Sequence, residues 1–239
     1  TGYGAMFFLR NMLEQAGSGM DGQRVLISGS GNVATHAAEK VLQLGGTPLT
    51  LSDSGGFILA DGGLTQEQID WVKDLKGLRR GRISEAADEF GNISFHEGQR
   101  PWGVEADCAA PCATQNEVNG EEAATMLKNG VKAIAEGANM PCEQAAVDQF
   151  QDAKILFGPA KAVNAGGVGV SGLEMSQNSA RIAWGEDNLR KLLEDMMKDI
   201  HDACVTHGKD DDGHVNYLKG SNIAGFVKVA DAMLAYGHV

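Results

Sequence analysis

The residues that could do chemistry begin with Gly29-Ser30-Gly31-Asn32-Val33-Ala34, a G-x-G-x-x-A motif. In this motif the first glycine makes a tight turn, the second lets a pyrophosphate approach the backbone, and the small last residue lets a helix pack closely on a strand. The amides at the start of that helix bind the anion, and the helix dipole adds to the attraction. The motif therefore predicts a dinucleotide site, provided that a strand precedes it and a helix follows it.

A second group of residues bears on which dinucleotide would bind. Asp53 lies nineteen residues beyond Ala34, where an acidic side chain bonds the ribose 2'-hydroxyl and favours NAD. Ser54 follows directly, and a basic cluster comes later, formed by Lys76, Arg79, Arg80 and Arg82. Guanidinium groups can hold the 2'-phosphate of NADP with paired hydrogen bonds, but a solvated basic face explains the cluster equally well. The residues alone therefore leave NAD and NADP open.

The elements that must position these residues follow from the periodicity of the apolar side chains. Short apolar runs predict strands at residues 25–27, 49–51, 93–95, 106–109, 131–135 and 154–157. Three- and four-residue spacings predict helices between most of them, and capping boxes at Thr65 and Asn119 mark two helix starts. Strands that alternate with helices indicate an α/β fold with a doubly wound, mostly parallel, Rossmann-like sheet that carries helices on both faces.

The pattern changes after residue 157, where strands give way to helices. Apolar spacing predicts a long helix around residues 189–203 and another around residues 223–234, the second apolar on two faces. We predict a dinucleotide-binding domain over residues 1–170 and a C-terminal helical segment over residues 171–239, with Ser171 as a helix N-cap. This segment should pack on the first domain and on a substrate domain outside the chain, because a helix that is apolar on two faces must be covered twice. The chain also opens within a predicted helix and without a starting methionine, which suggests a fragment of a longer chain.

Composition restricts the partners and the compartment. The 239-residue chain has a formal net charge of -12, which disfavours binding to nucleic acid and to anionic lipid. It contains no signal peptide and no apolar run of about 18 residues, so we expect neither secretion nor a membrane span. The four cysteines form no CxxC pair and no zinc spacing, which favours a reducing cytoplasm and no metal site.

Beyond single motifs, ordered blocks along the chain resemble the hexameric glutamate dehydrogenases. The blocks are Thr1–Gly4, Gly29–Ala34, Pro111–Asn116, Glu136–Pro141, Lys161–Val168, Ser171–Asn178, Asn222–Phe226 and Asp231–Met233. The resemblance covers essentially the whole chain but only the second half of the family's polypeptide. It implies a C-terminal coenzyme-binding domain, and Ser52-Asp53-Ser54 with Arg79 looks like the bacterial branch that uses NADP, with NAD as the alternative.

The resemblance also implies roles for single residues. Thr1 and Asn32 would hold the nicotinamide end, Asn139 and Asn164 would lie beside the nicotinamide ribose and the substrate amino group, and Gly167 and Val168 would line the substrate pocket. Ser171 resembles the hydroxyl that contacts the side-chain carboxylate of glutamate. Read without the resemblance, the asparagines and the serine are ordinary turn and capping residues.

The implied reaction is the reversible oxidative deamination of L-glutamate to 2-oxoglutarate and ammonia. In the family, lysines and an aspartate of the other domain do the acid–base work, so we assign no catalytic residue here and expect this chain to be inactive alone. A cytoplasmic homo-oligomer is implied for the full enzyme. Two alternatives are an amino acid dehydrogenase for an apolar amino acid, which would lack the run from Ser171 to Asn178, and a non-catalytic nucleotide-binding module.

Overall fold

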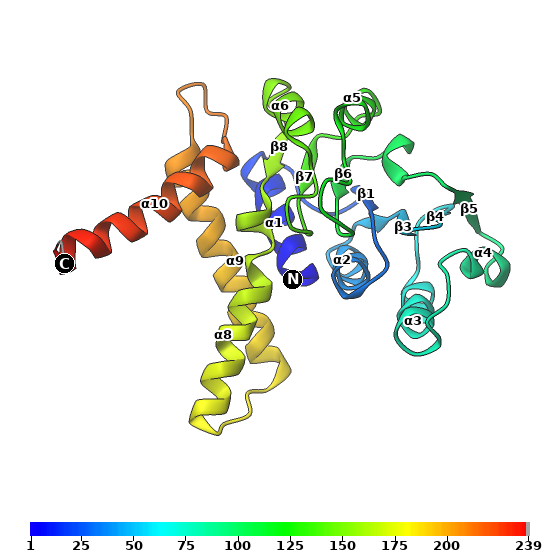
Figure 1. Ribbon diagram of the computed structural model, residues 1–239, viewed down its shortest axis with the longest axis horizontal. Coiled ribbons are helices and arrows are strands. Elements are labelled where there is room, and N and C mark those ends of the chain that lie inside the picture. Colours follow the sequence, from blue (N-terminus) through cyan, green and yellow to red (C-terminus); the bar gives the residue numbers. More distant parts are fainter. Residues whose placement is uncertain (238–239) are drawn as a thin grey trace.

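The structure, a computed structural model, describes residues 1–237 of the chain (Figure 1). Its helices are α1 (Gly2–Gln15), α2 (Asn32–Gln43), α3 (Gln66–Asp74), α4 (Glu85–Glu89), α5 (Gly120–Lys128), α6 (Gln144–Asp152), α7 (Ala160–Val163), α8 (Ala165–Ala180), α9 (Glu186–Gly208) and α10 (Tyr217–Tyr236). Its strands are β1 (Arg24–Ile27), β2 (Thr47–Pro48), β3 (Thr50–Asp53), β4 (Gly56–Ala60), β5 (Ile93–Glu97), β6 (Cys108–Ala110), β7 (Ala133–Ala135) and β8 (Leu156–Gly158). A π-helical turn (Leu75–Arg79) extends α3, and a 3-10 turn (Pro101–Gly103) lies before β6. Within this described part, no helix combines the length and the apolar character that crossing a membrane requires.

Five strands form the main sheet in the order β2-β1-β6-β7-β8, and every neighbouring pair is parallel. Successive side chains of a strand point to opposite faces. Val25 and Ile27 of β1 therefore join one buried cluster with α1 and α2, whereas Leu26 joins another with α5 and α6. Figure 1 shows these two helix layers on opposite sides of the sheet. The predicted α/β, doubly wound architecture is confirmed.

The predicted strand at residues 49–51 corresponds to the start of β3 and to Leu49, the residue that separates β3 from β2, and these two short strands belong to different sheets. β2 pairs with β1, whereas β3 turns away and forms an antiparallel sheet with β4 and β5. The hydroxyl of Thr50 bonds both the amide and the carbonyl of Ile27, which replaces the backbone ladder at this point. Sequence analysis missed β4, because this strand depends on pairing with a neighbour on each side and lacks a distinctive alternation of its own.

Helix α8 begins at Ala165, so the prediction that Ser171 is a helix N-cap is wrong. The first turns of α8 contain three glycines, a composition that disfavours a helix. Packing explains one of them directly: a Cβ atom at Gly166 would lie 2.9 Å from Leu193 and 3.2 Å from the Cα atom of Gly4. The predicted boundary between residues 170 and 171 falls inside α8, and the division of the chain into two segments stays a prediction.

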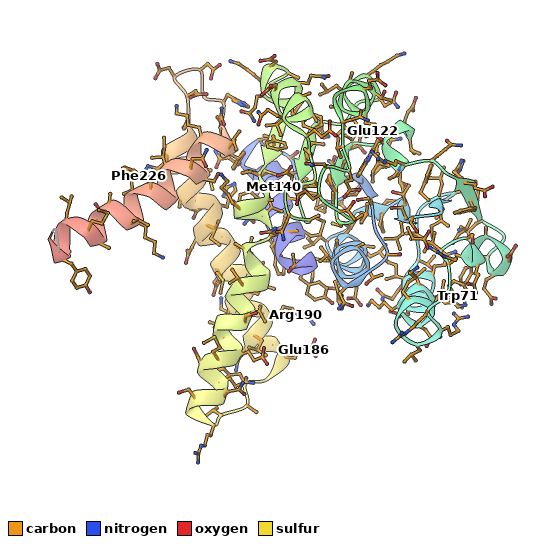
Figure 2. The ribbon with its side chains drawn as sticks, in the orientation of Figure 1. Trp71, Glu122, Met140, Glu186, Arg190 and Phe226 are labelled. Carbon is orange, nitrogen blue, oxygen red and sulfur yellow. The ribbon has the colours of Figure 1, made fainter. Side chains whose placement is uncertain are left out.

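The C-terminal helices extend beyond the sheet. α9 packs against α1, α8 and α10, and Figure 1 shows the α8–α9 hairpin and α10 projecting away from the body in different directions. Large apolar side chains along α10 are exposed, including Phe226, Val229, Met233 and Leu234. Phe226 is labelled on this helix in Figure 2. The second apolar face predicted for this helix thus lies open in the described part of the chain.

The glycine contact between α1 and α8 generates a stability prediction. Changing Gly166 to Ala should lower the free energy of unfolding by about 1–3 kcal/mol, because the added methyl group meets the backbone of Gly4. Gly172→Ala in the same helix is the matched control, since a Cβ atom there meets nothing within 4 Å. The control should raise the free energy of unfolding by about 0.5–1 kcal/mol through helix propensity. Urea denaturation of both variants measures the difference, and equal effects would contradict the packing argument.

Candidate functional site

The turn between β1 and α2 leaves the start of a helix open. Gly29 has a φ of +83°, and a Cβ atom there would lie 2.9 Å from the carbonyl oxygen of Cys112, so this position excludes other residues. Gly31 is the N-cap of α2, and among residues 1–237 no side chain caps this helix. A Cβ atom at Gly31 would meet open space. The amides of the first turn of α2 are therefore available to an anion that approaches over Gly31.

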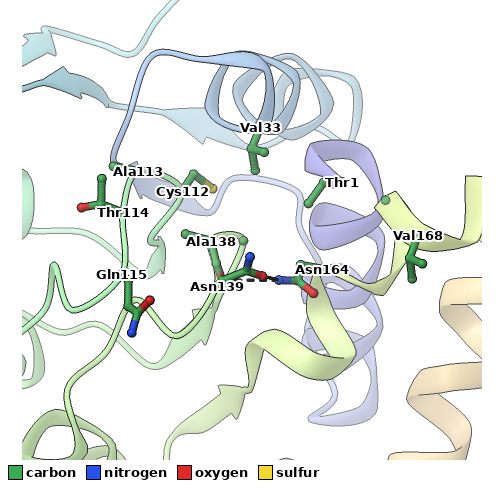
Figure 3. A pocket seen from close by; sticks show the side chains of 12 residues that line it. Thr1, Val33, Cys112, Ala113, Thr114, Gln115, Ala138, Asn139, Asn164 and Val168 are labelled. Carbon is green, nitrogen blue, oxygen red and sulfur yellow. Dashed lines mark hydrogen bonds between the residues drawn. The ribbon is translucent and has the colours of Figure 1, made fainter. Parts of the chain in front are cut away.

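A cavity of about 600 Å³ lies beside this turn, at the carboxyl ends of β1, β6 and β7. Its lining consists of Thr1, Val33, Cys112, Ala113, Thr114, Gln115, Gly137, Ala138, Asn139, Asn164, Gly167 and Val168. The chain passes from β1 to β2 on one side and later places β6 on the other, so the cavity opens at the point where the strand order reverses. Open α/β sheets bind their ligands at such a switch point. Figure 3 shows this pocket from close by.

Two asparagines meet across the cavity. The side-chain amide of Asn164 donates a hydrogen bond of 2.8 Å to the side-chain oxygen of Asn139, the pair joined by a dashed line in Figure 3. Asn139 follows β7, whereas Asn164 lies between α7 and α8. A Cβ atom at Gly167 would overlap the hydroxyl of Thr1, so α8 and the start of α1 are in close contact at the cavity.

The structure brings some of the predicted site residues together and places others nearby. Six of them line the cavity: Thr1, Val33, Asn139, Asn164, Gly167 and Val168. Asn32 lines a second, adjoining cavity of about 280 Å³ that also includes Thr1 and Val33. Gly29, Ser30 and Gly31 form the turn itself. Ser171 is exposed one helical turn beyond Gly167, whose carbonyl accepts a 3.2 Å hydrogen bond from its hydroxyl.

Sequence analysis missed two buried carboxylates that hold the loops of the cavity. Glu117 accepts hydrogen bonds from the amides of Ala113 and Thr114, at 2.9 and 3.3 Å. Glu136 accepts hydrogen bonds from the amides of Ala160 and Cys142, at 2.7 and 3.3 Å. Burial raises the pKa of both carboxyl groups, and the backbone donors oppose this effect without cancelling it. The only signal in the sequence was position, because Glu136 opens one of the family blocks and Glu117 directly follows another.

The cavity contains little that could transfer a proton. Of its lining side chains, only Cys112 titrates, and burial raises the pKa of this thiol well above its ordinary range. The remaining polar lining groups within the described residues are hydroxyls, amides and backbone atoms. The lining side chains of this part of the site can bind and orient a ligand, but they offer no general acid or base for work near neutral pH.

Asp53 lies at the end of β3, and both of its carboxylate oxygens accept hydrogen bonds from within the protein. One carboxylate oxygen accepts the amide of Gly55 at 2.9 Å, and the other accepts Lys76 and the amide of Ile83, both at 3.0 Å. Burial works to raise the pKa of Asp53, but the hydrogen bonds from Ile83, Gly55 and Lys76 outweigh it and hold the pKa below its ordinary value. The side chain is only 10% exposed, so Asp53 acts here as an anchor for the loop that carries the basic residues.

The basic cluster divides between two surroundings. Arg82 donates a 2.8 Å hydrogen bond to the hydroxyl of Ser54. Arg79 pairs with Asp74 at 3.1 Å and stacks 4.5 Å above the ring of Trp71, which is labelled in Figure 2. Asp53 and Ser54 lie next to the turn between β1 and α2, because the amide of Gly29 donates a 2.8 Å hydrogen bond to the hydroxyl of Ser52.

Comparisons with known proteins agree with this architecture. The chain matches the family described as "Glutamate/Leucine/Phenylalanine/Valine dehydrogenase" over residues 1–237. It is 52% identical to the "NAD(P)-specific glutamate dehydrogenase" of Xylanibacter ruminicola, over 99% of this chain and 53% of that protein. It is 51% identical to the "NADP-specific glutamate dehydrogenase" of Salmonella typhimurium, over 99% of this chain and 53% of that protein.

A solved structure is similar over the whole described fold. The glutamate dehydrogenase of Plasmodium falciparum superposes with a TM-score of 0.96 at 38% identity, over 100% of this chain and 51% of that one. The chain therefore spans about half the length of the relatives that it matches.

The anchoring of Asp53 generates a prediction on pH. Asp53→Asn should lower the free energy of unfolding by about 1.5–3 kcal/mol at neutral pH, because the charged hydrogen bond to Lys76 is lost. The pKa of Asp53 in the folded protein lies below its ordinary value of 3.8. The loss of stability in Asp53→Asn should therefore be complete above pH 3.8, and it should disappear as the pH falls through the pKa of the folded protein. Denaturation curves across this range measure it. Asp74→Asn, which removes an exposed ion pair with Arg79, is the control and should change stability by less than about 1 kcal/mol.

Proposed function

This chain belongs to the Glutamate/Leucine/Phenylalanine/Valine dehydrogenase family, and from that premise we propose that it is the coenzyme-binding part of an NADP-dependent glutamate dehydrogenase. The reaction would be the reversible oxidative deamination of L-glutamate to 2-oxoglutarate and ammonia. The observation that carries the proposal is the uncapped start of α2 at Gly31, which opens beside the cavity at the switch point of the sheet. The relatives named as glutamate dehydrogenases support the choice of glutamate.

The residues present fit a dinucleotide. The first-turn amides of α2, from Asn32 onward, would bind the pyrophosphate without help from a positive side chain. This resolves the tension between an anionic ligand and a chain with a net charge of -12. The open space over Gly31 and the tight turn at Gly29 are what close approach of a phosphate to the backbone requires.

The other proposed residues lie towards the reacting end. Thr1 and Asn32 would hold the nicotinamide, and Asn139 and Asn164 would orient its ribose and the substrate amino group. Gly167, Val168 and Ser171 follow along the start of α8 and would form one wall of the substrate pocket. The bound nicotinamide supplies the hydride chemistry, and these residues bind, orient and exclude water. None of them is assigned a proton-transfer step.

The acid–base groups would come from outside this chain. Because a buried thiol is the only lining side chain that titrates, we propose that lysines and an aspartate of a separate substrate domain complete the site. The full enzyme would be a homo-oligomer. All four cysteines are buried and free in the described chain, which supports the proposed cytoplasmic location.

The surroundings of Asp53 support NADP over NAD. Both carboxylate oxygens of Asp53 are bonded within the protein, and Lys76 offsets its charge, so a ribose 2'-hydroxyl has a weakened partner here. Ser54 with Arg82 offers a hydroxyl and a guanidinium side by side, and Arg79 ends the π-helical turn three residues before Arg82. A 2'-phosphate is the group that such donors hold best.

The central test is binding without turnover. The 239-residue chain should bind NADP, measured by quenching of its tryptophan fluorescence or by calorimetry, and should not reduce NADP when glutamate is added. The reason is that the described cavity positions ligands, but its lining side chains include none that can take the proton near neutral pH. Glutamate-dependent formation of NADPH by the purified chain would contradict the assignment of the acid–base groups to another domain. Absence of any dinucleotide binding would overturn the function itself.

Cofactor choice has its own test. Arg82→Ala and Ser54→Ala should weaken NADP binding by about tenfold or more and leave NAD binding nearly unchanged, because a charged hydrogen bond to the 2'-phosphate is lost. Arg79→Ala should act in the same direction. Arg24→Ala is the charge-matched control, because Arg24 pairs with Asp107 at the amino ends of β1 and β6, whereas the cavity lies at the carboxyl ends of these strands. Equal loss of NADP and NAD binding in the Arg82 variant would count against NADP as the natural coenzyme.

A further inference from the structure

The loop after β6 forms one wall of the cavity but has little regular structure. Ala113, Thr114, Gln115 and Asn116 are all exposed, and Asn116 adopts a left-handed backbone with a φ of +54°. An exposed loop without helix or strand hydrogen bonds is normally mobile. A wall that must meet a ligand at fixed distances therefore needs a separate support.

Glu117 provides that support from inside the protein. Its side chain is buried, with the residue only 7% exposed, and one carboxylate oxygen accepts the amides of both Ala113 and Thr114. Both amides belong to residues that line the cavity. The carboxylate thus bonds amides three and four residues earlier in the chain, which fixes the curvature of the loop.

The loop that Glu117 holds is also tied to the phosphate turn at its other end. The hydroxyl of Ser28, which precedes Gly29, accepts a 2.9 Å hydrogen bond from the amide of Cys112, the residue before Ala113. Ser28 and Glu117 therefore hold consecutive amides of this loop, Ser28 that of Cys112 and Glu117 those of Ala113 and Thr114.

We propose that Glu117 is a positioning residue for the nicotinamide half of the dinucleotide, which it serves by fixing the Ala113–Thr114 wall against the Gly29 turn. The inference rests on the proposed function. Glu117 does not line the cavity, so it acts through the backbone that it holds. The adenosine end, proposed at Asp53 and Ser54, lies on a different loop, whose side chains are held by Gly55, Lys76, Ile83 and Arg82 rather than by Glu117.

The experiment separates the two halves of the ligand. Glu117→Ala should weaken binding of NADPH to the chain by about tenfold or more, since a displaced wall disturbs every contact made through it. Adenosine 2',5'-bisphosphate lacks the nicotinamide half, so its affinity should change less than twofold. Changes at sites that share no partners alter each other's binding free energy by no more than about 0.3–0.5 kcal/mol, which corresponds to that factor. Glu117→Gln should restore NADPH binding, because the amide oxygen can still accept both backbone donors.

A local readout and a control complete the test. Hydrogen exchange at the amides of Ala113 and Thr114 should accelerate in Glu117→Ala and stay slow in Glu117→Gln. If the alanine variant does not fold, Glu117→Asp gives the same comparison, because its shorter side chain cannot span the loop. Glu122→Gln is the control, at the residue labelled in Figure 2: the carboxylate of Glu122 accepts the amide of Asn119 at the start of α5 and Arg100, rather than Ala113 or Thr114. Arg100 also donates to the backbone carbonyl of Glu117, so this control disturbs the same surroundings without removing the Glu117 carboxylate.

The outcomes are distinct. Weaker NADPH binding with unchanged binding of the bisphosphate supports the proposal, as does rescue by glutamine. Unchanged NADPH affinity in Glu117→Ala, or equal loss for both ligands, would overturn it while leaving the proposed function intact. Failure of the unmodified chain to bind either ligand would overturn the proposed function and this inference together.

Discussion

The start of α2 must stay uncapped to bind an anion, and it must also keep a fixed position. The residues that pack around the cavity provide that fixed position. The helix has no side-chain cap among the described residues, and the space over Gly31 is open. Its position is fixed from the sides instead. Gly29 packs against the carbonyl of Cys112, and a Cβ atom at Gly2 would overlap the carbonyl of Val33, so α1 and the loop after β6 both press on the turn. A bare helix end becomes a specific site only when its neighbours leave it one position.

The negative side chains near the cavity are bonded within the protein. The net charge is -12, but the carboxylates nearest the cavity are turned towards backbone amides or towards Lys76. Glu117 and Glu136 face into the protein and organise the loops, while the amides of α2 face outward. Negative side chains thus hold the loops of the cavity from the inside of the protein. The surface that faces a ligand consists mainly of amide and hydroxyl dipoles. An acidic domain can in this way attract an anion at one point.

The small residues of α1 and α8 join the two ends of the described site. Gly4 and Gly166 allow these helices to cross in close contact, which sets Thr1 beside Gly167 at the mouth of the cavity. Side chains from the beginning of the chain and from residues after β8 therefore share one surface. The proposed division of labour follows from the chemistry of that surface: it binds and orients, and the groups that move protons would be supplied by a partner domain.

The sequence by itself determined the features that depend on neighbouring residues. The strand, the Gly29–Ala34 turn and the following helix are local, and the alternation of strands with helices was enough to predict a doubly wound sheet. Tertiary structure decided what depends on distant partners. Gly166 suits α8 because Gly4 and Leu193 lie against it, and Arg82 became the partner of Ser54 only through the fold of the loop between them. Glu117 was unremarkable in the sequence, because a buried carboxylate acquires its role from the amides that the fold turns towards it. Periodicity records which side chains share a face, whereas contacts between segments far apart in the chain exist only after folding.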